Sequence, residues 1–141
     1  MGILAKSMGL YTDFYELTMS QGYLLSGKEG RSACFDYFFR KNPFFGGYVI
    51  FAGLEEVLDI LENLRFDPED ISFLKEKGFD EKFLNYLKKF RFTGSVYSVA
   101  EGEVSFPQEI LFRVEAPVIE AQLIETVVLN MLNYSSLIAT K

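Results

Sequence analysis

Two neighbouring cations are the side chains best suited to binding an anionic group. Arg40 closes a segment rich in aromatic residues, Arg31–Arg40, and Lys41 follows it directly. A guanidinium presents paired donors that match the oxygens of a phosphate. Arg40 is therefore a candidate phosphate ligand, and Lys41 is a weaker one. The alternative is that Arg40 ends a strand and pairs with a surface acid.

Polar residues also gather at the start of the first predicted helix. Thr12 and Asp13 are both good N-caps, and Asp13 with Glu16 forms an Asp version of the capping box. The helix they begin should run to Gly27, with apolar residues around most of its axis. From the residues alone, Tyr15 in this helix is best interpreted as a core tyrosine.

Other reactive groups are scarce. The chain has no His, which excludes Ser-His-Asp, Cys-His and His-zinc sites within it, because His is the usual base near neutral pH and the usual nitrogen ligand. We predict no metal site and no catalytic residue in this chain. Gly46 and Gly47 form a weak signal that indicates a turn rather than a phosphate-binding loop.

Composition bounds the class of protein. The 141 residues predict about one domain, and with 49% hydrophobic residues the chain should pack a core. A net charge of -6 argues against a nucleic-acid partner. Cys34 lies in an apolar run and is predicted to be a reduced core thiol. Neither Met1–Leu10 nor Val118–Thr140 resembles a signal peptide or a membrane span. We therefore expect a cytoplasmic protein with no membrane partner.

Hydrophobic periodicity predicts an α+β fold, because helices and strands do not alternate regularly. The expected strands contain aromatic or alternating apolar residues, and the expected helices have apolar positions three and four residues apart. The predicted order is a helix from 12–13 to 27, a strand 31–40, a helix 49–64, helices 68–77 and 80–89, strands 95–99 and 110–115, and a helix from 118 onward.

The last predicted helix begins after Pro117 and reaches Thr140 and Lys141 without a Gly, Asn or Pro stop signal at that end. Apolar groups lie on both of its faces. We expect this chain to be an N-terminal piece of a longer one. The alternative is a short protein whose final helix packs against a second subunit.

Several segments, taken together and in order, resemble the opening of nicotinate phosphoribosyltransferase. They cover nearly the whole chain and comprise Thr12–Met19, Phe35–Phe44, Phe51–Glu56, Glu101–Pro107, Gln122–Thr126, Leu129–Asn130 and Ser136–Lys141. The resemblance implies an α/β-sandwich-like N-terminal domain of a type II phosphoribosyltransferase at 1–117. It also implies that 118–141 is the first helix of an incomplete α/β barrel.

The resemblance implies roles for five residues. The family transfers the phosphoribosyl group of phosphoribosyl pyrophosphate to nicotinate, usually with ATP hydrolysis. Tyr15 is expected to stack on the pyridine ring from the partner subunit of a homodimer with shared active sites, and Asp13 to lie near that ring. Arg40 is the candidate for gripping the phosphate or pyrophosphate of the sugar substrate. Thr140 and Lys141 end a segment that in the wider type II group leads into the barrel and the active-site region, and the alternative for both is an exposed helix end.

The remaining machinery of the family should lie beyond this chain. Its catalytic His, its carboxylate-binding Arg and its main phosphoribosyl loop are expected after Lys141, so the chain alone should be inactive and bind no cofactor. ATP and Mg²⁺ are implied only for the complete enzyme.

Three alternatives stay open. Quinolinate phosphoribosyltransferase has a similar last helix, but an Arg follows its helix Glu where this chain has Thr126 after Glu125. A neutral side chain there favours a monocarboxylate. Nicotinamide phosphoribosyltransferase shares the start but not the run Arg40–Phe44. The third alternative is a non-catalytic dimerising module.

Overall fold

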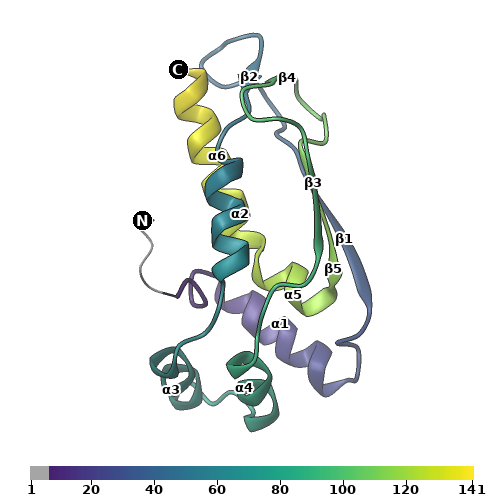
Figure 1. Ribbon diagram of the computed structural model, residues 1–141, viewed down its shortest axis with the longest axis vertical. Coiled ribbons are helices and arrows are strands. Elements are labelled where there is room, and N and C mark those ends of the chain that lie inside the picture. The colour runs from purple at the N-terminus through teal and green to yellow at the C-terminus, as the bar shows by residue number, and fades with distance from the viewer. Residues whose placement is uncertain (1–6) are drawn as a thin grey trace.

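The computed structural model describes residues 7–141, and it confirms the mixed α+β class. Helices and strands succeed one another without regular alternation (Figure 1). In chain order they are α1 (Phe14–Leu25), β1 (Ser32–Tyr37), β2 (Val49–Ile50), α2 (Leu54–Asn63), α3 (Pro68–Glu76), α4 (Glu81–Lys88), β3 (Ser95–Ser98), β4 (Val104–Ser105), β5 (Phe112–Pro117), α5 (Val118–Leu123) and α6 (Glu125–Thr140).

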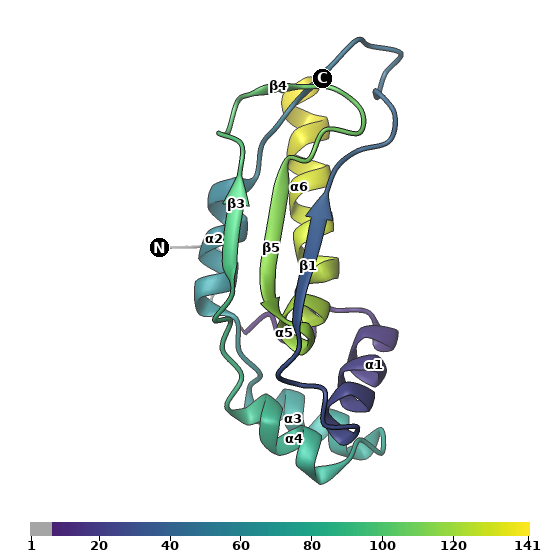
Figure 2. The same ribbon diagram turned by 90° about the vertical axis from the view of Figure 1, so that its right-hand side faces the viewer.

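A three-stranded antiparallel sheet in the order β1-β5-β3 forms the centre of the fold. In β5, buried Phe112, Val114 and Ala116 alternate with the more exposed Arg113 and Glu115, as expected for a strand with one face on the core. Figure 2 shows α2 and α6 behind the sheet and no helix in front of it. The sheet is thus covered on one face by the described residues.

The helices and the sheet share one hydrophobic core. α6 contacts both α2 and β2, α1 packs on α5, and α3 and α4 pair beyond them (Figure 1). At the contact between α2 and α6, a side chain on Gly53 would collide with Ser135, whose Cβ lies 2.8 Å from the position of an added Cβ. Gly53 also has a positive φ of 98°, which glycine adopts without strain. A glycine is therefore required where α2 begins.

That turn corrects the prediction of one helix over 49–64. Val49 and Ile50 pair instead with β4, a strand that the sequence analysis missed, and the N–H of Phe51 donates to the carbonyl of Glu103 at 2.9 Å. The helix starts only after Gly53. Periodicity did not find this, because a two-residue strand is too short to show a pattern.

The single helix predicted from Val118 onward is also wrong in one respect. It is broken at Ile124 into α5 and α6. All residues from Ile119 to Ile124 are buried, so apolar spacing carries no information on where a helix here should bend. The other predicted helices and strands agree with the structure to within a few residues. The predicted domain boundary at 117 stays a prediction.

Cys34 is exposed, which contradicts its prediction as a core thiol. It lies on β1, where Phe35 and Tyr37 face α6, and alternation therefore turns Cys34 to the uncovered face of the sheet. Separately, none of the helices within residues 7–141 has the length and apolar character needed to cross a membrane.

Candidate functional site

Tyr15 lies in the first turn of α1 and is 46% exposed, so the structure contradicts its interpretation as a core tyrosine. Its hydroxyl nevertheless has a fixed partner, since Tyr15 Oη donates to Glu125 Oε1 at 3.1 Å. Desolvation, together with the hydrogen bond to Glu125, raises the pKa of Tyr15 to about 12. The phenol therefore stays protonated near neutral pH.

Glu125 is the first residue of α6, and its second oxygen is also engaged. Glu125 Oε2 accepts from Gln122 Nε2 at 3.0 Å, and Gln122 is itself buried. A carboxylate in the first turn of a helix is favoured by the helix dipole. Glu125 thus joins the Tyr15 hydroxyl to the end of α5.

A second carboxylate ties α1 to α6 beside this link. Glu16 is fully buried, and its Oε1 accepts from Thr126 Oγ1 at 2.8 Å. Its Oε2 accepts from the hydroxyl of Thr12 and from the N–H of Asp13, the latter at 3.2 Å. The predicted capping box of Asp13 and Glu16 is confirmed. Asp13 itself is exposed beside Tyr15, so it is available for a ligand as well as for the cap.

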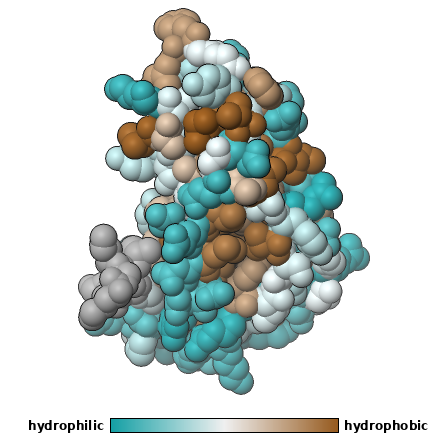
Figure 3. Space-filling model, turned by 45° about the horizontal axis from the view of Figure 1, so that its top comes forward, coloured by the Kyte–Doolittle hydropathy of each residue, from teal (hydrophilic) through white to brown (hydrophobic). Residues whose placement is uncertain are grey.

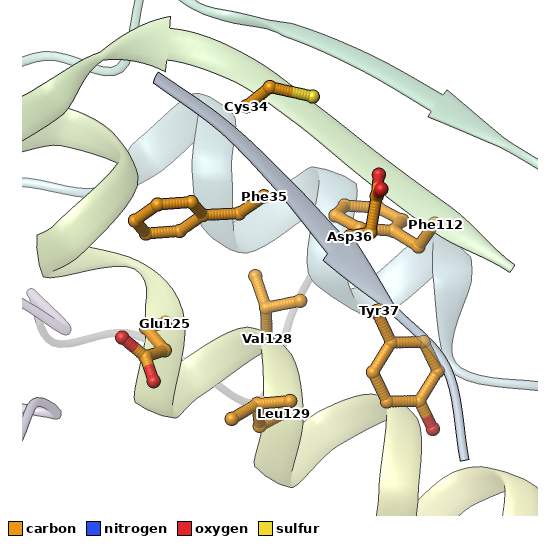
Figure 4. A pocket seen from close by; sticks show the side chains of 8 residues that line it. All are labelled: Cys34, Phe35, Asp36, Tyr37, Phe112, Glu125, Val128 and Leu129. Carbon is orange, nitrogen blue, oxygen red and sulfur yellow. The ribbon is translucent and has the colours of Figure 1, made fainter. Parts of the chain in front are cut away.

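A hollow of about 380 Å³ adjoins this cluster between β1 and α6. Figure 4 shows Phe35 and Tyr37 reaching from β1 toward α6, Val128 and Leu129 on α6 beneath them, and Glu125 at one end. The lining is mostly apolar, and Asp36 and Glu125 are its charged residues. Such a surface suits a flat, apolar ring better than a highly charged molecule.

The remaining predicted site residues lie at the other end of α6. Thr140 is held by the fold, because its Oγ1 accepts from the N–H of Ile50 at 2.9 Å and donates to the carbonyl of Ser136 at 2.6 Å. Lys141 Nζ lies 5.9 Å from the centre of the Phe44 ring. Arg40 is exposed, and no hydrogen bond or ion pair of its side chain occurs among residues 7–141.

The structure therefore divides the predicted site residues into two groups. Tyr15 contacts Glu125, and Asp13 precedes Tyr15 by two residues. Thr140 and Lys141 lie at the far end of α6, beside the loop segment 43–48 that follows Arg40 in the chain (Figure 1). At 1.5 Å per residue, the 15 steps from Glu125 to Thr140 span about 22 Å. One chain does not bring the two groups together around one small ligand.

The sequence analysis did not predict that Gln122 is part of the site, and it did not predict the contact between Glu125 and Tyr15. The pairing of Gln122 with Glu125 at a spacing of three residues is a signal that helical periodicity can supply. The contact with Tyr15 spans 110 residues, and no local pattern indicates it. Among residues 7–141, no three His, Cys, Asp or Glu side chains are arranged to hold a metal ion.

The sequence and the fold match one family of proteins. Residues 10–133 match the family model of the nicotinate phosphoribosyltransferase N-terminal domain. The chain is 48% identical over 141 residues to nicotinate phosphoribosyltransferase of Bacillus subtilis. The alignment covers 99% of this chain and 29% of that protein. It is 44% identical over 134 residues to nicotinate phosphoribosyltransferase 1 of Arabidopsis thaliana, covering 93% of this chain and 24% of the relative.

Solved structures agree with these relatives. The crystal structure of human nicotinic acid phosphoribosyltransferase matches with a TM-score of 0.84 and 34% identity, over 92% of this chain and 27% of that one. A nicotinate-nucleotide pyrophosphorylase from Pyrococcus furiosus matches with a TM-score of 0.65 and 19% identity, over 94% of this chain and 28% of that one. At that identity the second match shows the fold alone.

The fold and the sequence together define an N-terminal domain of the phosphoribosyltransferase class. The chain belongs to the nicotinate phosphoribosyltransferase family. It spans less than a third of the length of the relatives described above.

Proposed function

We propose that this chain supplies the N-terminal domain of an enzyme that makes nicotinate mononucleotide and pyrophosphate from nicotinate and phosphoribosyl pyrophosphate. Family membership supports the reaction. The observation that carries the role of this domain is the Tyr15 side chain, which keeps its ring exposed while its hydroxyl is bound to Glu125. An electron-poor pyridine needs a flat, immobile partner of this kind.

The contribution of this chain is binding rather than bond making. Tyr15 stacks on the pyridine ring, and exposed Asp13 lies beside it at the start of α1. We assign no catalytic residue to the chain, whose sequence contains no His. The ring nitrogen attacks the ribose carbon as pyrophosphate leaves, so the chain assists by orienting the ring.

At the other end of α6, Arg40 and Lys141 provide positive charge for the phosphorylated sugar. Arg40 is the stronger candidate, because its guanidinium is exposed and can donate two bonds to one phosphate. Thr140 serves this end indirectly, since its hydroxyl fixes the last turn of α6 to Ile50.

A homodimer with shared active sites would join the two groups. They lie about 22 Å apart along α6 in one chain, so a complete site needs Tyr15 from one copy and the cationic end from another. We expect the whole enzyme to use ATP and Mg²⁺, and we assign neither of them to residues 7–141. A cytoplasmic location accords with the substrates proposed.

A chimera tests the proposal. This chain replaces the matching N-terminal segment of the Bacillus subtilis relative, and pyrophosphate release is measured with nicotinate, nicotinamide or quinolinate, each with and without ATP and Mg²⁺. We expect release with nicotinate to be the fastest. A chimera that is folded and dimeric by circular dichroism and size-exclusion chromatography but inactive with all three pyridines would contradict the proposal. Faster release with quinolinate or nicotinamide would favour the corresponding alternative.

One observation favours the second candidate, a non-catalytic dimerising module. Large exposed apolar side chains gather at the end of the molecule that carries the C-terminus (Figure 3). They include Phe44, Phe45, Val104, Phe106, Leu137 and Ile138. An apolar surface of this kind marks contacts with other proteins. A dimer of the 141-residue chain at low concentration, combined with an inactive folded chimera, would support the module over the enzyme domain.

A further inference from the structure

The Tyr15 ring needs an orienting contact. Its side chain lies on the exposed side of α1, where an aromatic side chain without a partner can exchange between rotamers. A ring that must present one face to a ligand binds more tightly when it is held in a single orientation before binding. The hydrogen bond from Tyr15 Oη to Glu125 Oε1 is the one side-chain hydrogen bond of Tyr15 among residues 7–141.

Glu125 is well suited to hold the ring because it is held itself. Its two oxygens have different donors, Tyr15 at 3.1 Å and buried Gln122 at 3.0 Å. Its backbone is fixed at the start of α6, where neighbouring Thr126 is bonded to buried Glu16. Glu16 secures the helix that carries Tyr15, whereas Glu125 contacts the Tyr15 side chain directly.

We propose that Glu125 is a positioning residue that orients the Tyr15 ring for the pyridine substrate through its bonds to Tyr15 and Gln122. The inference rests on the proposed function. Glu125 acts through Tyr15 and takes no part in bond making. In this contact the phenol donates and the carboxylate accepts.

A double-mutant cycle in the chimera tests this role. Glu125→Ala and Tyr15→Phe should each raise the KM for nicotinate about tenfold with little change in kcat, as expected for loss of one charge-assisted hydrogen bond. The double variant should show no further increase, because both changes remove the same contact. Glu125→Gln retains an acceptor oxygen and should restore most of the affinity.

A matched control comes from α2. Glu56 also lies in the first turn of a helix and is exposed, so Glu56→Ala should leave the KM for nicotinate unchanged. Additive effects of Glu125→Ala and Tyr15→Phe, or an unchanged KM in Glu125→Ala, would overturn the proposal.

A second measurement does not depend on activity. In the 141-residue chain, phenolate absorbance is titrated with alkali, and the signal of Tyr15 is obtained by subtracting the Tyr15→Phe variant. Glu125→Gln should shift the Tyr15 pKa from about 12 part of the way to its ordinary value of about 10. If the Tyr15 pKa were unchanged in Glu125→Gln, the proposed hydrogen bond would be wrong even if the chimera is active. A lowered Tyr15 pKa would support the hydrogen bond even if the chimera is inactive.

Discussion

At the start of α6, polar side chains are bonded to one another, whereas at its end they are bonded to the backbone or lie exposed. Glu16, Thr126, Glu125 and Tyr15 form side-chain bonds between α1 and α6. At the other end, Thr140 holds the N–H of Ile50. The first arrangement holds the Tyr15 hydroxyl, while near the second the Arg40 side chain is exposed and has no hydrogen bond or ion pair among residues 7–141. Side-chain bonds thus link α1 to the start of α6, whereas at the end of α6 Thr140 is bonded to the backbone of Ile50 and Ser136.

Glu16→Ala should have the largest effect, because it removes the central acceptor of the first arrangement. Thr12, Thr126 and the N–H of Asp13 would all lose a buried partner. We expect the free energy of unfolding to fall by about 3 kcal/mol, measured by urea denaturation of the 141-residue chain. Glu56→Ala is the control, with an expected change within about 0.5 kcal/mol. Equal effects of the two variants would show that the bonds between α1 and α6 contribute little.

Tyr15→Ala should have the second largest effect, which is a loss of nicotinate binding. Loss of an aromatic stacking partner should raise the KM for nicotinate in the chimera about tenfold to a hundredfold, with little change in the KM for phosphoribosyl pyrophosphate. Tyr97→Ala is a matched control, since Tyr97 is 55% exposed on β3. An unchanged KM for nicotinate would remove Tyr15 from the site.

Arg40→Ala tests the opposite end. We expect the KM for phosphoribosyl pyrophosphate to rise about tenfold, through loss of charge-assisted bonds, while the KM for nicotinate stays the same. Arg40→Lys should restore binding only in part, because an ammonium lacks paired donors. Lys77→Ala, which changes a cation just after α3, serves as the control. If Arg40→Ala raised the KM for nicotinate instead, the assignment of Arg40 to phosphoribosyl pyrophosphate and of Tyr15 to nicotinate would be wrong.

Thr140→Val should have the smallest effect. It leaves the N–H of Ile50 without its acceptor, and we expect the free energy of unfolding to fall by about 1 kcal/mol. Thr140→Ser keeps the hydroxyl and should be close to the original chain in the same denaturation experiment. A rise in the KM for phosphoribosyl pyrophosphate without loss of stability would instead make Thr140 a direct ligand.

The prediction from sequence succeeded where the signal was local. The capping box of Asp13 and Glu16 fixed the start of α1, and the alternating apolar residues of 110–115 gave β5. It failed where a partner far along the chain decides the structure. Val49 and Ile50 pair with β4, so they form a strand despite their helical spacing. Cys34 is exposed because β1 carries it on the uncovered face of the sheet.

The same division holds for the candidate site. Residue types and order alone determined the family, the absence of a His base in this chain, and Asp13, Tyr15, Arg40, Thr140 and Lys141 as the residues to examine. Only the tertiary structure decided that Tyr15 is exposed with its hydroxyl held by Glu125, and that Thr140 is engaged at the far end of α6. The physical reason is that hydrogen bonds between residues 90 to 110 positions apart depend on how helices pack, and packing is set by the whole core rather than by any local pattern.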